Sequence, residues 1–243
     1  MDPDGPDIEE LFAPVRPADA FGVVLSEARD VLAQVREPID AELWGSDIIG
    51  ALTQSASDMP SVMEALVTGL VPAAEKSGTA ESLALLRIFG AVGDATLRIA
   101  ATEAADRLSA KGIPAPGWAD VVGAPDPGEC WHYGDTGGRQ ESVTMTFSYS
   151  GAAHALSVLL DHGHGGKIKD IWVADATGLL AKTRETAASD SLILFEPLEV
   201  AQARFTLERA MSAGECPQEP DQEADVTAHR ALLAARLDLV SGR

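Results

Sequence analysis

Apolar residues in the first part of the chain recur at steps of three and four, which is the spacing of an amphipathic helix. Over residues 19–35 this pattern places the apolar side chains on one face. Pro38 interrupts it, and helical patterns resume over residues 39–55 and 60–76, the second of them broken at Pro72. Together these patterns predict a helical bundle.

Two more helices are indicated by residues that favour helix ends. Thr79 and Asp94 each precede an apolar-rich run, and their side-chain oxygens can accept hydrogen bonds from the free amides of a first helical turn. Gly78 is typical of a residue that ends a helix in the left-handed conformation. We therefore predict helices over about 80–91 and 95–110.

Beyond the bundle, the spacing of apolar residues changes from helical to alternating. Residues 141–149 and 153–161 each place apolar side chains at every second position, which is the pattern of a half-buried strand. A Ser-Gly pair between them is a turn signal. A two-residue loop puts Met145 opposite Leu156, and both apolar sets then share one face. The sequence therefore predicts an antiparallel hairpin.

The remaining patterns complete an α+β fold, with an N-terminal helical bundle, a small antiparallel β-meander and C-terminal helices. Further strands are expected over 168–174 and 129–133, and further helices from Asp175 or Thr177 to about 187, over 197–213 and over 226–241. Proline and glycine gather in the stretch before the first strand, as in a linker. We divide the chain into a flexible acidic N-terminus (1–17), a helical domain (18–112), a linker (113–128) and an α+β domain (129–243), whose meander spans 129–174.

The composition limits the classes of function. The chain carries 18 Lys and Arg against 38 Asp and Glu, a net charge of −20, and its basic residues are scattered singly. Two distant cysteines do not indicate a disulfide framework. The first residues lack the basic and apolar parts of a secretory signal, and no apolar run is long enough for a bilayer. We expect a cytoplasmic protein that binds no membrane and whose partner, if a protein, is basic.

The densest polar segment is the turn expected after the hairpin. It contains two acids, two histidines and two lysines within ten residues. A pairing of Asp161 with Ile168 would bring Asp161 and Asp170 within reach of one ion. Both acids, and Gln140 as well, would then lie on the face of the sheet that points away from the core. Either histidine could complete a nitrogen and oxygen shell suited to zinc or manganese. The alternative is that the acids cap turn amides and the histidines are solvated. The metal-ligand candidates are Asp161, His162, His164 and Asp170.

A second polar cluster lies in the loop expected before the hairpin. Asp135, Arg139 and Glu141 are interpreted as a binding rim at the same end of the sheet, joined by Lys167 from the neighbouring turn. The alternative is an ordinary glycine-rich loop between two strands. Both clusters belong to the turns at one end of the predicted sheet.

The run from Leu159 to Gly165 resembles the metal loop of metallo-β-lactamase-like hydrolases over about seven residues. Those enzymes need an Asp-His pair one residue beyond the second histidine of the loop, and Gly166 and Lys167 stand in those places. The chain is therefore not assigned to that family.

Most of the chain resembles uncharacterised proteins of high-GC actinobacteria. The matching residues are Cys130–Asp135, Gln140–Val143, His154–Leu156, Leu160–His162 and Gly165–Asp170, with Glu42–Gly45 and Ala101–Leu108 in the helical part. This resemblance implies no activity and assigns no residue a role.

Two functions remain open at this point. The favoured hypothesis is a non-enzymatic binding or interaction module, because no catalytic constellation is found in the sequence. The competing hypothesis is a metal-dependent hydrolase at the turn from Asp161 to Asp170, where an ion would lower the pKa of its bound water and Asp135 could act as general base. The sequence does not decide whether the protein is an enzyme.

The charge leads to a first prediction, that the protein does not bind DNA or RNA at physiological salt. A chain of net charge −20 without clustered lysines or arginines repels a phosphate backbone. A mobility-shift assay with a random duplex should show no complex. Micromolar, salt-sensitive binding would contradict the prediction.

Overall fold

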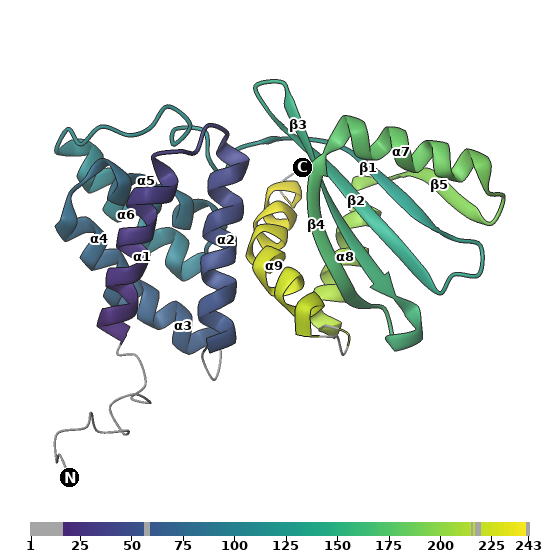
Figure 1. The fold of residues 1–243 in the computed structure, drawn as a ribbon, viewed down its shortest axis with the longest axis horizontal. Coiled ribbons are helices and arrows are strands. Elements are labelled where there is room, and N and C mark those ends of the chain that lie inside the picture. Colours follow the sequence, from purple (N-terminus) through teal and green to yellow (C-terminus); the bar gives the residue numbers. More distant parts are fainter. Residues whose placement is uncertain (1–16, 56–58, 215, 217–219, 242–243) are drawn as a thin grey trace, which may run out of the picture.

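The molecule consists of a bundle of helices beside a five-stranded antiparallel sheet (Figure 1). The computed structural model describes residues 17–55, 59–214, 216 and 220–241. The α+β class predicted from the sequence is confirmed. Within the described residues, no helix is long and apolar enough to cross a bilayer. The predicted flexible segment 1–17 lies outside the described residues except for Pro17, where the first helix begins.

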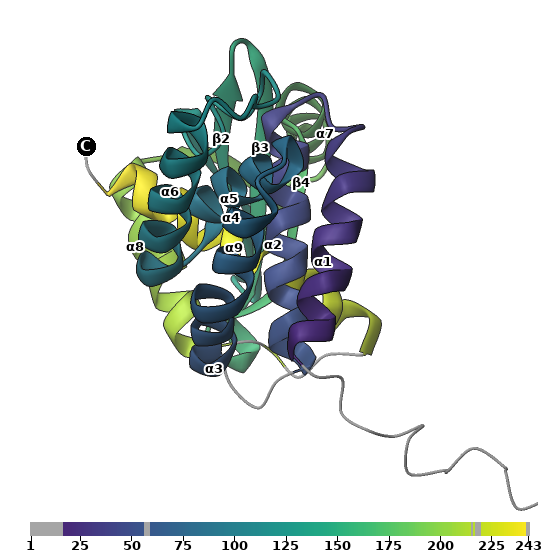
Figure 2. The same cartoon turned by 90° about the vertical axis from the view of Figure 1, so that its left-hand side faces the viewer.

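The helical half contains α1 (Pro17–Leu32), α2 (Pro38–Ser55), α3 (Met59–Ala65), α4 (Val71–Ser77), α5 (Ala80–Val92) and α6 (Ala95–Ala110). A π-helical segment (Leu66–Leu70) joins α3 to α4 just before Pro72, which lacks the amide hydrogen of a regular ladder. Both predicted caps are present. Thr79 accepts a hydrogen bond from the amide of Ser82 at 3.2 Å, and Asp94 accepts one from the amide of Leu97 at 2.8 Å. Figure 2 shows these helices in front of the sheet.

The sheet contains β1 (Asp126–Asp135), β2 (Gln140–Tyr149), β3 (Ala152–Asp161), β4 (Lys167–Asp175) and β5 (Ile193–Leu198), in the order β4-β3-β2-β1-β5. The helices α8 (Val200–Ala213) and α9 (Pro220–Val240) cover one face. The helix α7 (Ala176–Ser189) covers the other face and links the two edge strands (Figure 1).

The predicted hairpin is confirmed in register and in burial. Met145 pairs with Leu156 and Val143 with Val158, and all four side chains are at most 1% exposed. Alternation along two neighbouring strands therefore fixes the central ladder of the sheet.

The structure corrects two expectations about the sheet. The polar face of β2 is not open to solvent, because α7 lies over it and leaves Ser142 and Thr144 each only 6% exposed. The helix expected over 197–213 begins at Val200, since residues 193–198 form the unpredicted strand β5. Pro197 accounts for this miss, because proline lowers strand propensity and is tolerated only at a sheet edge, where β5 lies.

Helix α9 packs between the two halves and contributes to both hydrophobic cores (Figure 1). Leu232 belongs to the core of the helical bundle, whereas Leu233 and Leu237 belong to the core between the sheet and α8. The close approach of α9 to α2 depends on Gly50, because a Cβ atom there would lie 2.6 Å from the carbonyl oxygen of Thr227.

A buried ion pair joins α2 to α9. The carboxylate of Glu42 and the guanidinium of Arg236 are at most 1% exposed, with Nη2 2.5 Å from Oε2. The same carboxylate accepts hydrogen bonds from the hydroxyl of Tyr149 on β2 at 2.8 Å and from the amide of Gly123, before β1, at 2.9 Å. These partners compensate for the loss of hydration of the carboxylate.

The other side of Arg236 faces aromatic rings of the sheet. Its guanidinium lies 5.2 Å from the centre of the Phe147 ring, and its Nη2 is 3.4 Å from Nε2 of His154. Burial and the charge of Arg236 lower the pKa of His154 to about 4, so the ring is neutral at pH 7 and can accept a hydrogen bond. We call Glu42, Arg236, Tyr149 and His154 the buried hub.

The contact between α2 and α9 leads to a second prediction. Gly50→Ala should lower the free energy of unfolding by about 1–3 kcal/mol, because the new methyl group collides with the backbone of α9. Gly22→Ala on α1 is the matched control, since its methyl group meets nothing within 4 Å and should stabilise the helix by up to about 1 kcal/mol. Urea unfolding measures both changes. Equal effects of the two substitutions would contradict the packing described.

Candidate functional site

The turn between β3 and β4 is built around Asp161. Its carboxylate accepts a hydrogen bond from the amide of Gly163 at 2.8 Å, and its carbonyl accepts one from Gly166 at 2.9 Å. His162–His164 forms a single turn of 3-10 helix, and Gly165 ends it with a φ of 81°. Glycine is required there because side chains rarely tolerate that backbone conformation.

The connection between α8 and α9 brings a cysteine to this turn. The amide of Ile168 on β4 donates to the carbonyl of Gly214 at 3.2 Å, and the amide of Cys216 donates back to Ile168 at 2.9 Å. These two bonds pair the connection with the outer edge of β4. Cys216 is thereby held beside the β3–β4 turn, although it is far from that turn in the sequence.

Three metal-ligating side chains converge at this point. One ligand atom from each of Asp161, His164 and Cys216 lies within 4.8 Å of the other two. Oδ2 of Asp161 is 3.2 Å from Nδ1 of His164 and accepts a hydrogen bond from the side-chain amide of Gln140, also at 3.2 Å. We call Asp161, His164 and Cys216 the turn cluster.

The protonation of the turn cluster follows from its surroundings. Burial alone would raise the pKa of Asp161, but hydrogen bonds from Gln140, His164 and the amide of Gly163 outweigh it and lower that pKa. Burial and the nearby charge of Asp161 raise the pKa of Cys216. At neutral pH the cluster therefore holds a carboxylate and a protonated thiol, and a metal ion would displace the thiol proton.

A separate row of hydrogen-bonded titratable groups lies on the opposite face of the sheet. Oε2 of Glu141 is 3.0 Å from Nε2 of His132, and its Oε1 is 3.0 Å from Nε2 of His162. The hydrogen bond to Glu141 raises the pKa of His132, and that bond, with a further one from His162, lowers the pKa of Glu141. Glu141 and His162 line a cavity of about 450 Å³ beside α8, together with Arg209.

The predicted ligand candidates divide between these two faces. Asp161 and His164 meet in the turn cluster, whereas His162 turns toward Glu141. Asp170 belongs to no group of converging ligands among the described residues. The register assumed for the metal hypothesis is wrong by one residue, because a β-bulge between Leu159 and Leu160 pairs Asp161 with Lys167 instead of Ile168.

The predicted binding rim is placed at the same end of the sheet. Asp135 accepts a hydrogen bond from the amide of Gln140 at 3.4 Å and so closes the β1–β2 loop. The carbonyl of Arg139 accepts a hydrogen bond from the amide of His162 at 2.9 Å. Lys167 contributes its carbonyl, 3.8 Å from the sulfur of Cys216. Backbone contacts therefore connect the two turns.

Sequence reasoning missed Cys216 and His132. Neither residue stands in a spacing typical of a ligand or of a catalytic group, and each reaches its partners only through tertiary pairing. Cys216 was visible only as one of two cysteines in the chain.

Comparison of the chain with protein-family models, with curated proteins and with solved structures finds no match.

The His132–Glu141 pair leads to a third prediction. Because the pKa of His132 is raised in the folded state, its protonated ring contributes its full stabilisation below pH 6.5. This contribution is lost as the pH rises through the pKa of His132 in the folded protein. Because the pKa of Glu141 is lowered in the folded state, its carboxylate contributes its full stabilisation above pH 4.5. This contribution is lost as the pH falls through the pKa of Glu141 in the folded protein. The pair should therefore stabilise the protein most between these two values.

The substitution Glu141→Gln tests this pH range of greatest stabilisation, with chelator present in every buffer. The difference in free energy of unfolding between parent and variant should be largest between pH 4.5 and 6.5 and shrink on both sides. Glu196→Gln is the control, since its carboxylate is 65% exposed and 3.8 Å from His132 and should change little. A difference independent of pH would refute the assignment.

Proposed function

We propose that this protein is a non-enzymatic binding module that holds one zinc ion in the turn cluster. The observation that carries the proposal is the convergence of carboxylate, imidazole and thiol ligand atoms from two segments that are distant in sequence. Oxygen, nitrogen and sulfur ligands of this kind are those that zinc accepts. A thiolate favours zinc over manganese, which prefers carboxylate and water oxygens.

The surroundings of the turn cluster suit a resident ion. The side-chain amide of Gln140 donates to Asp161 and orients its carboxylate, as outer partners of metal ligands commonly do. The backbone pairing of Ile168 with the segment around Cys216 holds the thiol in place. An ion bound there would tie the start of α9 to the edge of the sheet.

A binding role is favoured over metal-dependent hydrolysis by where the acid–base groups lie. Glu141 and His162 hydrogen-bond to each other on the face opposite Asp161, since successive side chains of a strand point to opposite faces. Asp135, the general base of the hydrolase hypothesis, accepts a backbone hydrogen bond within its own loop.

Cobalt substitution tests the zinc proposal and is our fourth prediction. The purified protein should retain one zinc per chain, and replacement by cobalt should produce a thiolate-to-cobalt charge-transfer band. Cys216→Ala should abolish the band. Cys130→Ala should retain it, because Cys130 lies in the core of the sheet, where burial raises its pKa to about 11.

The two histidines of the turn provide a second matched pair. His164→Ala should weaken zinc binding by at least about tenfold, whereas His162→Ala should leave it close to that of the parent, because His162 faces Glu141. Equal losses for both histidines, or a cobalt band that survives Cys216→Ala, would overturn the proposal.

A further inference from the structure

A cavity of about 350 Å³ lies between α7 and the sheet, on the face away from α8 and α9. Its floor includes three short hydroxyl side chains from the central strands, Ser142, Thr144 and Ser157, together with Leu159. A helix that packs on a sheet usually meets large apolar side chains, which fill the space between the two. Here the hydroxyl side chains are too short to reach α7, so the space stays open.

The hydroxyl groups of the floor are not all satisfied by the protein. Oγ1 of Thr144 and Oγ of Ser157 lie 2.6 Å apart and hydrogen-bond to each other. The Ser142 side chain is only 6% exposed, and its hydroxyl, which has no hydrogen-bond partner among the described residues, stays open to the cavity. Ser142 lines the cavity, so a bound molecule could supply the missing hydrogen bond.

The walls of the cavity combine aromatic rings with leucine side chains of α7, Leu179 and Leu180. Tyr133, Trp172 and Phe195 line it. The ring of Phe195 stacks on that of Trp131 at 4.7 Å, and the guanidinium of Arg184 from α7 lies 5.7 Å from the centres of both rings. Aromatic walls with a few placed polar groups are typical of sites for small flat molecules.

The charge at the cavity is opposite to that of the molecule. Lys182 on α7 is the one charged side chain that lines the cavity among the described residues, in a chain of net charge −20. Its ammonium group has no carboxylate partner among these residues. A cation beside an aromatic cavity favours a ligand that carries an anionic group on a flat ring.

We propose that the cavity under α7 binds a small aromatic carboxylate. The ring of the ligand lies between the aromatic walls, and its carboxylate forms an ion pair with the ammonium group of Lys182. The hydroxyl of Ser142 gains a hydrogen bond to the ligand. This site is separate from the turn cluster, so the proposal does not depend on zinc binding.

The test is a titration of the full chain with benzoate, followed by amide chemical shifts and carried out in chelator. Benzoate should saturate with a Kd of about 0.1–1 mM, as expected for a ligand of its size, and should shift the amides of Ser142 and Thr183. Benzamide lacks the charge and cyclohexanecarboxylate lacks the flat ring, so each should bind at least about tenfold more weakly.

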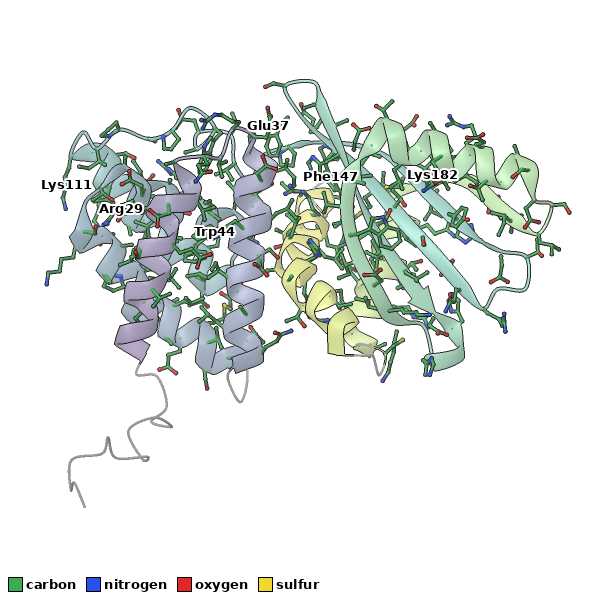
Figure 3. The ribbon with its side chains drawn as sticks, in the orientation of Figure 1. Arg29, Glu37, Trp44, Lys111, Phe147 and Lys182 are labelled. Carbon is green, nitrogen blue, oxygen red and sulfur yellow. The ribbon has the colours of Figure 1, made fainter. Side chains whose placement is uncertain are left out.

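Matched variants locate the site. Lys182→Gln should weaken benzoate binding about tenfold, and Lys111→Gln, at the other end of the molecule (Figure 3), should not change it. Ser142→Ala keeps the cavity and should weaken binding several-fold, while Ser142→Leu should fill the cavity and abolish it. Absence of saturable binding to the folded parent would overturn the proposal. So would equal binding by parent, Lys182→Gln and Ser142→Ala.

Discussion

The buried ion pair between Glu42 and Arg236 is the constraint on which the arrangement of the two halves depends. Two charges removed from water stabilise a fold only if their remaining hydrogen-bonding capacity is also met. Here the partners come from α2, α9, β2, β3 and the segment before β1. The helical bundle, the last helix and the sheet must therefore occupy one relative position for the hub to form. Misplacing any one of them leaves a buried charge without its partners.

The hub also explains why the two proposed sites lie where they do. The face of the sheet toward α8 and α9 is largely filled by apolar side chains and by the hub, and its cavity beside α8 lies at the strand ends around Glu141 and His162. The β3–β4 turn lies at the margin of this face, where Cys216 arrives just before α9 begins. The face under α7 makes no contact with the hub, so short hydroxyl side chains and a cavity are tolerated there.

The sequence predicts those structural features that depend on residues close to one another along the chain. The Met145–Leu156 register follows from alternation on two strands joined by a tight turn, and the caps at Thr79 and Asp94 act within a single helical turn. Strand β5 pairs with β1, which is distant in the sequence, and Pro197 interrupts its strand pattern. Cys216 reaches Asp161 and His164 only because its segment pairs with β4. A β-bulge also shifts the pairing of β3 with β4 by one residue from the register that a regular alternation predicts. Glu42 and Arg236 are single charges in helical patterns, and nothing local distinguishes them from surface residues.

We infer that the hub makes the two halves one cooperative unit. Native-state hydrogen exchange of parent and Glu42→Gln tests it most directly, through the amides of Leu85 in α5 and Leu156 in β3, both fully buried. Removing the carboxylate charge leaves Arg236 buried without its counterion. We expect the opening free energies of both amides to fall together, by about 3–5 kcal/mol. If the opening free energy of the Leu85 amide falls while that of the Leu156 amide keeps its parental value, the two halves open independently and the hub does not couple them.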